Sequence, residues 1–239
     1  FEEGLSFCEQ GLGIDPQSKE LIEVYETLKD ERAAKEEKDK QRELGREKEV
    51  EMERKLFHEI TSKGIILGPS AFDEKHRNFG TDLKPELLFS SQATSSAEIS
   101  SIKWPLLLLY PGSQQSDVIQ ETYESNIVSE LVSLVFPDSG SPVFWDKDKF
   151  EYRMSNLECY IELNSVEPFK SVDEYLDWKV NKIKRTKSLP CDRRMWANVD
   201  KNCSIMKILK CPGHVVPGGV ITLHLYPKES VPHRKFLEK

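Results

Sequence analysis

The sequence predicts an α+β fold, with a long charged helix near the N-terminus followed by a compact, mixed α/β domain built on a small sheet. The first observation is the placement of charge, because residues 17–57 contain 11 basic and 13 acidic side chains. The second is that, from residue 102 onward, apolar runs of strand length alternate with segments of helical periodicity. A solvated helix and a separate hydrophobic core account for both observations.

Residues 1–16 predict a short helix with small residues on its packing face. Gly4 and Gly11 lie two helical turns apart, and Pro16 ends the segment. This pattern is typical of the last helix of a tetratricopeptide repeat array, although any short helix ending at Asp-Pro is an alternative. One such helix cannot bury its own apolar face, so we expect the array to be truncated at Phe1.

Residues 17–62 predict a capping helix that continues as a solvated charged spacer. Apolar residues mark a packed face up to Leu28, but few follow before Val50. If helical throughout, about 40 residues would span roughly 60 Å. A coiled coil is the alternative, but it needs apolar positions sustained over several heptads. Acidic residues precede basic ones by four positions, which stabilises a helix, at Glu31–Lys35, Glu36–Lys40 and Glu51–Lys55.

Residues 63–101 predict a loosely ordered linker. Gly64 and Gly68-Pro69 end the preceding helix. Five serines follow between Ser91 and Ser101, without a clear apolar period.

Residues 102–239 predict the compact domain. Trp104–Tyr110 is a continuous apolar run, typical of a strand buried on both faces, and Pro105 is expected at its beginning. Ser116 is expected to cap a helix whose apolar stripe continues to Val135. Residues 157–163 alternate between apolar and polar side chains, which predicts a half-buried strand.

The last third of the domain predicts two further helices and a hairpin. Ser171 is expected to cap a helix that reaches Trp178, and Ile205–Leu209 forms a shorter one. Two apolar runs within 214–226 flank Pro217-Gly218-Gly219, a plausible hairpin turn. A basic stretch at 179–202 interrupts this pattern.

Several of these motifs together resemble a known domain. They are the run from Trp104 to Pro111, then Gln115-Ser116-Asp117, Phe136-Pro137, Trp145-Asp146, Tyr152, and Asn156 to Glu162. The combination is similar to the C-terminal wheel domain of the tetratricopeptide-repeat co-chaperones related to the cyclophilin-seven suppressor and tetratricopeptide repeat protein four. The resemblance covers residues 1–60 and 102–176 well and 203–226 loosely. Gly112 stands where such proteins usually have an acidic residue, and 179–202 resembles an insertion.

The resemblance implies a non-catalytic co-chaperone fragment. In that family the repeats recruit heat-shock protein 90 or 70, and the C-terminal domain helps to deliver clients such as translation elongation factor two. The chaperone-binding clamp would then lie outside this sequence. The resemblance also implies a cytoplasmic protein, with the nucleus as a second compartment. Five scattered cysteines without a CxxC pair agree with a reducing compartment.

No residue pattern predicts catalysis, a cofactor or a metal site, so we expect that the chain is not an enzyme. The ligand types for zinc are present in Cys191, Cys203, Cys211 and His214, but their spacing lacks the paired CxxC knuckle. The motifs GxSxG, GxxxxGK[ST], GxGxxG and HExxH are absent. The histidines considered as catalytic bases lie in polar, terminal or strand segments and are His58, His76, His224 and His233.

The competing hypothesis is a ribosome- or RNA-associated adaptor that acts through the basic stretch 179–202. Its eight cations face only two acids, Asp192 and Asp200, but nearby acids such as Glu158 and Asp173 could neutralise them. The net charge of −7 gives no general attraction to nucleic acid or anionic membrane, and no apolar run is long enough to span a bilayer. The eight cations are Lys179, Lys182, Lys184, Arg185, Lys187, Arg193, Arg194 and Lys201.

Overall fold

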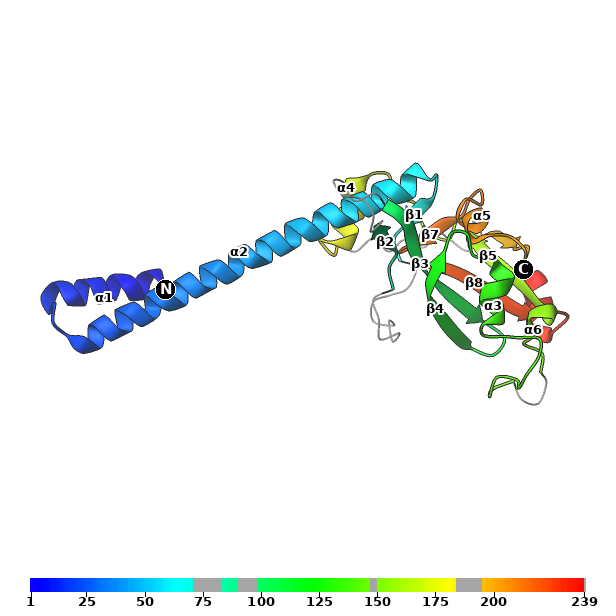
Figure 1. Ribbon diagram of the computed structural model, residues 1–239, viewed down its shortest axis with the longest axis horizontal. Coiled ribbons are helices and arrows are strands. Elements are labelled where there is room, and N and C mark those ends of the chain that lie inside the picture. Colours follow the sequence, from blue (N-terminus) through cyan, green and yellow to red (C-terminus); the bar gives the residue numbers. More distant parts are fainter. Residues whose placement is uncertain (71–82, 90–98, 147–149, 184–194, 239) are drawn as a thin grey trace. The chain divides into compact units, whose positions relative to one another are not determined.

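The computed structural model describes residues 1–70, 83–89, 99–146, 150–183 and 195–238. The chain forms two compact units, Phe1–Glu53 and Arg54–Lys239. The first contains α1 (Glu2–Ile14) and most of α2 (Lys19–Ser62), and the second contains a mixed α+β domain (Figure 1). Among the helices of these described residues, none combines the length and the apolar character that crossing a membrane needs.

In the first unit, glycines bring α1 and α2 together. A Cβ atom on Gly11 would lie 2.9 Å from Leu21 Cδ1, and one on Gly4 would lie 3.2 Å from Leu28 Cδ1. Leu5 is buried in the contact, as is Cys8. The small residues at these two positions therefore set the approach of the helices.

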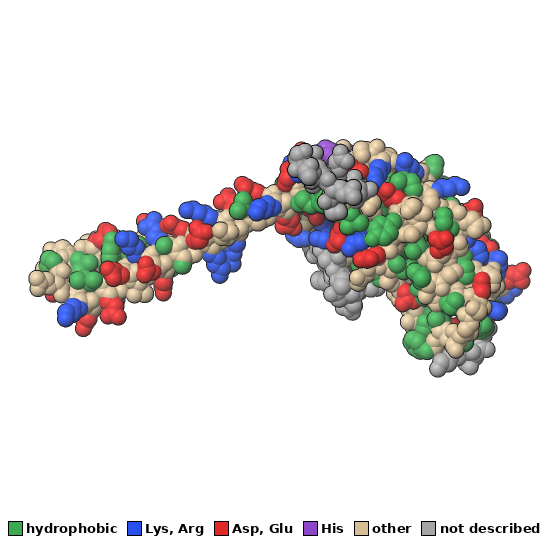
Figure 2. All heavy atoms as spheres, viewed as in Figure 1, with side chains coloured by type: hydrophobic (Ala, Val, Ile, Leu, Met, Phe, Trp, Pro, Cys, Tyr) green, Lys and Arg blue, Asp and Glu red, His purple; other side chains and the backbone are tan. Residues whose placement is uncertain are grey.

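Beyond this contact, α2 is a solvated helix, as predicted. Figure 2 shows acidic and basic side chains mixed along its surface, and Arg32 Nε lies 2.8 Å from Glu36 Oε1 one turn away. Such pairs each contribute a few tenths of a kcal/mol to an isolated helix. The continuous helix of 44 residues confirms the predicted long charged element.

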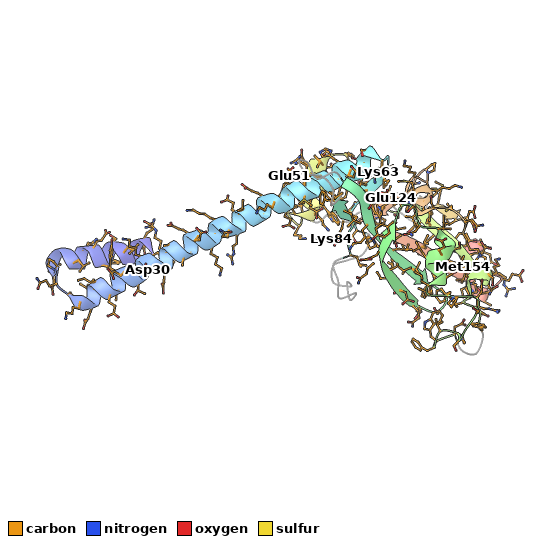
Figure 3. All side chains as sticks on the ribbon, in the orientation of Figure 1. Asp30, Glu51, Lys63, Lys84, Glu124 and Met154 are labelled. Atoms are coloured by element: carbon orange, nitrogen blue, oxygen red, sulfur yellow. The ribbon has the colours of Figure 1, made fainter. Side chains whose placement is uncertain are left out.

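The second unit includes the last turns of α2. Leu56, Phe57 and Ile60 are buried there, and the Phe57 ring stacks on Tyr175 with 5.0 Å between ring centroids. Tyr175 lies on α4 (Val172–Lys179), whose predicted cap is confirmed, because Ser171 Oγ accepts a hydrogen bond from Glu174 N. Lys63, just after the helix, faces Glu124 across a 2.9 Å ion pair (Figure 3).

A six-stranded sheet forms the centre of this unit, beside a two-stranded parallel sheet. In the larger sheet the order is β2-β3-β8-β5-β6, with β4 paired to β3. β3 and β8 are parallel, and the other pairs are antiparallel. The strands are β1 (Ile66–Gly68), β2 (Glu86–Phe89), β3 (Ile99–Tyr110), β4 (Gln115–Tyr123), β5 (Leu157–Leu163), β6 (Met195–Asn198), β7 (Val215–Pro217) and β8 (Ile221–Pro227). The remaining helical elements are α3 (Val128–Ser133), the 3-10 turn η2 (Met154–Asn156), α5 (Ile205–Leu209) and α6 (Val231–Leu237).

β3 is the buried central strand that the sequence predicts. Trp104 and Tyr110 are both 0% exposed, and the three leucines 106–108 between them are at most 1% exposed. The position of Pro105 differs from the expectation, because it lies inside the strand. The pairing with β4 shifts register between Trp104 and Leu106, and this irregularity accommodates a residue that has no N–H to donate.

The helix predicted from Ser116 to Val135 is wrong. Gln115–Tyr123 is the strand β4, which follows β3 through a tight turn with Gln114 at φ 56°, and the helix α3 begins only at Val128. Apolar residues four apart share a face in a helix and also in a strand. The paired edge of β3 decides between them, because a helix there would leave a row of buried backbone groups without partners.

The linker predicted over 63–101 contains regular structure where it is described. β1 pairs with β7 in the small sheet, and β2 pairs with the start of β3. Residues 71–82 and 90–98 lie outside the described residues. The partner of β1 is about 150 residues away in sequence, so no local pattern reveals this pairing.

The predicted hairpin within 214–226 is also wrong. Its two strands, β7 and β8, belong to different sheets. Gly218 and Gly219 lie between them with φ of 62° and 78°, so the turn that the sequence indicates is real. It turns the chain from one sheet into the other instead of pairing its two arms.

We expect Gly68→Ala to lower the free energy of unfolding of the second unit by about 1–3 kcal/mol. A Cβ at this position would lie 2.6 Å from Val166 Cγ2 and 2.9 Å from the Glu167 carbonyl oxygen, and the latter cannot rotate away. Urea unfolding followed by tryptophan fluorescence measures the change.

Gly45→Ala is the matched control, because a Cβ on this helical glycine would meet nothing within 4 Å. It should leave the urea midpoint unchanged and raise the helix content seen by circular dichroism, since alanine favours a helix over glycine by about 1 kcal/mol. Equal urea midpoints for Gly68→Ala and the wild type would contradict the close packing of β1.

Candidate functional site

An aromatic cluster lies at the end of β3. Tyr110 stacks on Trp145 at 5.6 Å between ring centroids and meets Phe136 edge-on at 4.9 Å. Tyr152 contacts Trp145 edge-on at 4.7 Å. Each ring thus has at least two aromatic neighbours, and such contacts fix ring orientation as well as burying apolar surface. Asp117 on β4 also accepts a hydrogen bond from the Tyr110 hydroxyl, at 2.9 Å.

A cavity of about 360 Å³ opens beside this cluster. Its walls come from segments far apart in the sequence, which the sheet brings together. The lining residues are Gly112, Ser113, Trp145, Asp146, Glu151, Tyr152, Pro227, Ser230 and Pro232. Gly112 keeps one wall open, because a Cβ there would lie 2.9 Å from Pro232 Cγ and 3.4 Å from the Tyr152 hydroxyl.

Negative charge dominates the lining of this cavity. Asp146 is only 7% exposed, and its Oδ2 accepts a hydrogen bond of 2.7 Å from Tyr152 N. Glu151 provides a second carboxylate at the rim, and none of the nine lining residues is basic. The cavity therefore favours a cationic group.

The Tyr152 hydroxyl is the unusual group in the cavity. The side chain is 6% exposed, yet its oxygen has no hydrogen-bond partner in the described structure. Burial raises the pKa of Tyr152, the carboxylates of Asp146 and Glu151 raise it further, and the nearby Ser113 hydroxyl opposes them. The phenol is therefore neutral and offers both a donor and an acceptor to a ligand.

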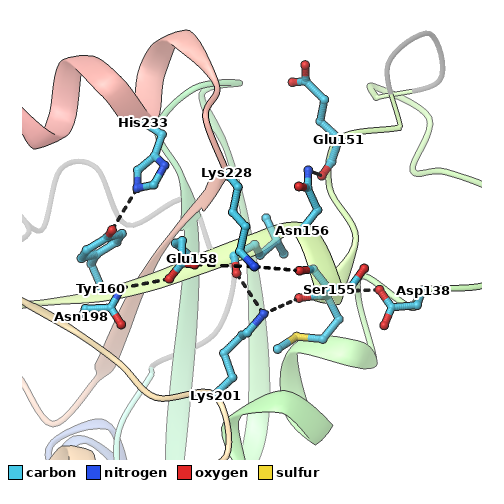
Figure 4. Close-up of polar contacts among 12 residues, drawn as sticks. Asp138, Glu151, Ser155, Asn156, Glu158, Tyr160, Asn198, Lys201, Lys228 and His233 are labelled. Atoms are coloured by element: carbon cyan, nitrogen blue, oxygen red, sulfur yellow. Dashed lines mark hydrogen bonds and ion pairs between the residues drawn. The ribbon is translucent and has the colours of Figure 1, made fainter.

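A polar network next to the cavity holds the chain between η2 and β5 (Figure 4). Lys201 Nζ donates to the carbonyl oxygens of Met154 and Leu157, at 2.9 Å and 3.1 Å. This contact corrects the reading of 179–202 as a uniformly basic stretch, because Lys201 is bound inside the domain. Asp138 joins the same region by accepting from Ser155 N at 2.7 Å.

The candidate zinc ligands do not form a metal site within the described residues, where no group of three potential ligands could hold a metal ion. Cys191 lies outside those residues. Burial raises the pKa of the Cys203 thiol. His214 Nδ1 lies 2.9 Å from the Ile208 carbonyl oxygen, which ties the ring to the end of α5.

The other histidines have structural surroundings. His233 is buried on α6, where its Nε2 lies 2.9 Å from the Tyr160 hydroxyl. His224 packs under Trp196, with 4.7 Å between ring centroids. His58 is exposed, and His76 lies outside the described residues.

The basic stretch 179–202 is described only in part, because residues 184–194 lie outside the described residues. Its last part is the strand β6, which pairs antiparallel with β5. Lys179 Nζ lies 5.8 Å from the centroid of the Trp178 ring. The stretch is therefore partly a component of the sheet, and deleting all of it would remove an edge strand.

Comparison with known proteins now places this domain. The family model "Cns1/TTC4 Wheel domain" matches residues 94–239. The chain belongs to this family. This confirms the resemblance seen in the motifs around Trp104, Trp145 and Asn156.

Individual relatives agree with that assignment. The chain is 24% identical to tetratricopeptide repeat protein 4 homolog of Dictyostelium discoideum, over 100% of this chain and 54% of that protein. It is 29% identical to tetratricopeptide repeat protein 4 of Mus musculus, over 68% of this chain and 43% of that protein. The chain thus spans about half the length of the curated relatives it matches.

A solved structure shares the fold. The Hsp90 co-chaperone Cns1 from Saccharomyces cerevisiae (delta69) aligns with a TM-score of 0.53 and 18% identity, over 99% of this chain and 64% of that one. At this identity the match supports the arrangement of helices and strands.

Sequence reasoning did not identify the cavity, although three of its lining residues are in the motifs that carry the resemblance. Trp145-Asp146 and Tyr152 are recognisable in the sequence. Their convergence with Pro227–Pro232 depends on the pairing of β5 with β8, 60 or more residues apart.

We expect Lys201→Met to lower the free energy of unfolding by about 2–4 kcal/mol, because it leaves two partly buried carbonyl oxygens without their donor. Thermal unfolding by circular dichroism measures the loss. Lys210→Met, on an exposed lysine in the same region of sequence, should change stability by less than about 0.5 kcal/mol. Similar losses in both variants would show that the Lys201 contacts contribute little.

We also expect the second unit to lose stability as the pH falls from 6.5 towards 4. Burial lowers the pKa of His224 to about 4, whereas an unfolded histidine titrates near 6.5. In that window the unfolded chain binds a proton that the folded chain does not, so unfolding becomes more favourable by up to about 1 kcal/mol per pH unit. Urea midpoints between pH 7 and 5 should fall less steeply for His224→Gln, whereas the exposed control His58→Gln should keep the wild-type slope. A wild-type slope in His224→Gln would contradict the assignment.

Proposed function

We propose that this chain is the C-terminal part of a co-chaperone that links heat-shock protein 90 or 70 to client proteins without catalysing a reaction. The observation that carries the proposal is membership of the Cns1/TTC4 Wheel family over residues 94–239, together with a match along the whole chain to a tetratricopeptide repeat protein 4 homolog. The related yeast protein is itself named an Hsp90 co-chaperone. The proposed location is the cytoplasm, with the nucleus as a second compartment.

The surroundings of the thiols support a binding role. A nucleophilic cysteine needs a lowered pKa, but burial raises the pKa of Cys159 to about 12 and also raises that of Cys203. These thiols are therefore protonated at neutral pH and pack as small apolar groups.

The first unit supports a continuation of the repeat array. Phe7 and Ile14 on α1 are 71% and 88% exposed, while Gly4 and Gly11 hold the other side of the helix against α2. In a repeat array each helix pair buries such residues against its neighbour. Within the proposal, upstream repeats bind the chaperone and the Arg54–Lys239 unit contacts the client.

Translation elongation factor two is the proposed client, and calorimetry with the purified factor tests this. We expect the 239-residue chain to bind the factor with a Kd in the micromolar range, about −8 kcal/mol. We expect the same chain to show no binding to heat-shock protein 90, and a longer protein that also carries upstream repeats to bind both in one complex. Absence of factor binding, with the domain folded by circular dichroism, would reject this client.

A charge variant separates this proposal from the ribosome or RNA adaptor. It replaces five cations of the basic stretch by glutamine and leaves β6 intact: Lys184→Gln, Arg185→Gln, Lys187→Gln, Arg193→Gln and Arg194→Gln. The co-chaperone proposal expects unchanged factor binding. Co-sedimentation of the wild type with ribosomes, lost in the variant while factor binding persists, would favour the adaptor.

A further inference from the structure

We propose that the cavity beside Trp145 is a binding site for an arginine side chain presented by a partner polypeptide. The inference goes beyond the co-chaperone role and does not depend on it, because it concerns one pocket of the domain and one type of side chain. Three independent features support it: the charge of the lining, an unpaired buried hydroxyl, and aromatic walls.

Charge selects a cation. Asp146 and Glu151 both line the cavity, and no lining residue is basic. Asp146 is buried and receives one hydrogen bond, from Tyr152 N to Oδ2. A carboxylate has about four acceptor positions, so Asp146 retains the capacity to accept further N–H groups.

The Tyr152 hydroxyl indicates a donor-rich ligand. A buried polar atom without a partner costs about 1–3 kcal/mol, and this one faces the cavity beside Gly112. Its oxygen lone pairs can accept an N–H from a guest. A guest with several N–H groups in a plane can thus reach the hydroxyl and the carboxylates together, as a guanidinium can.

The aromatic walls favour guanidinium over ammonium. Trp145 and Tyr152 stand edge-to-face, at an interplanar angle of 76°, so the cavity presents an aromatic ring in two orientations. A planar guanidinium stacks on such rings and is more weakly hydrated than an ammonium. The volume of about 360 Å³ exceeds that of one side chain, which leaves room for the flanking backbone of a peptide.

The walls are held in place before any ligand arrives. Trp145 is fixed by Tyr110 and Phe136 of the aromatic cluster, and Asp146 by the Tyr152 backbone. On the opposite wall, Ser230 caps α6 by accepting from His233 N, which sets the position of Pro232. A preorganised pocket loses little entropy on binding, so even a short peptide should show measurable affinity.

The test is a titration of the full chain with the peptide acetyl-Gly-Arg-Gly-amide, followed by the NMR signal of the Trp145 indole N–H. Trp145→Phe identifies this signal. We expect a saturable shift with the arginine peptide, a weaker one with the lysine analogue, and none with the citrulline analogue, which has nearly the same shape without charge. Equal shifts with arginine and citrulline, or no shift at millimolar peptide, would overturn the proposal.

Two variants examine the named groups. Tyr152→Phe removes only the unpaired oxygen and should weaken binding about fivefold without loss of stability, because that oxygen has no partner to lose. Glu151→Gln should weaken binding about three- to tenfold. Glu167→Gln is the matched control, an exposed carboxylate outside the cavity lining, and should bind like the wild type. Wild-type affinity in both Tyr152→Phe and Glu151→Gln would overturn the assignment, as would equal weakening in Glu167→Gln.

Factor binding and peptide binding give separate results. If the chain binds elongation factor two but not the arginine peptide, the co-chaperone proposal stands and this one fails. If it binds the peptide with the expected selectivity but not the factor, the pocket stands and the client is a different protein.

Discussion

The fold of the second unit depends on the complete burial of one strand, β3. Residues 106–108 are buried on both faces, so every backbone group there must find a partner along the strand edges. Lys103 pairs with Glu86 of β2 on one edge and with Tyr123 of β4 on the other. Since β4 also pairs with residues 106–109, β8 shares the edge that β2 uses. One apolar run therefore recruits three strands from distant parts of the chain.

This dependence explains which elements the sequence predicts. α1, α2, α4 and β5 have patterns complete within their own residues, such as the Ser171 cap or the alternation from Leu157 to Leu163, and these expectations are confirmed. The segment 115–123 has apolar spacing that fits a helix or a strand, and the choice depends on the edge of β3. β7 and β8 similarly follow their partners β1 and β3 instead of each other. Tertiary pairing overrides local pattern wherever a buried edge must be satisfied.

The candidate site was less accessible to sequence reasoning for the same reason. A residue type states what chemistry is present, but not whether the group is already in use. Lys201 counts as a surface cation by sequence, whereas in the fold it binds two carbonyl oxygens. Tyr152 carries the opposite lesson, because an ordinary tyrosine in the sequence is a buried hydroxyl without a partner in the fold. Both facts depend on which segments meet, and that is decided by the sheet.

The cavity is therefore more than a gap left by imperfect packing. Packing defects in a core are lined by apolar groups, because burying polar groups without partners costs free energy. Here the lining includes a carboxylate that is 7% exposed and a hydroxyl with no partner, next to four aromatic rings that pack closely. The sheet could satisfy these positions with apolar residues at no cost to its own pairing. A polar cavity held open by a rigid aromatic wall is instead what a preformed binding site requires, and the sign of its charge identifies the guest as a cation.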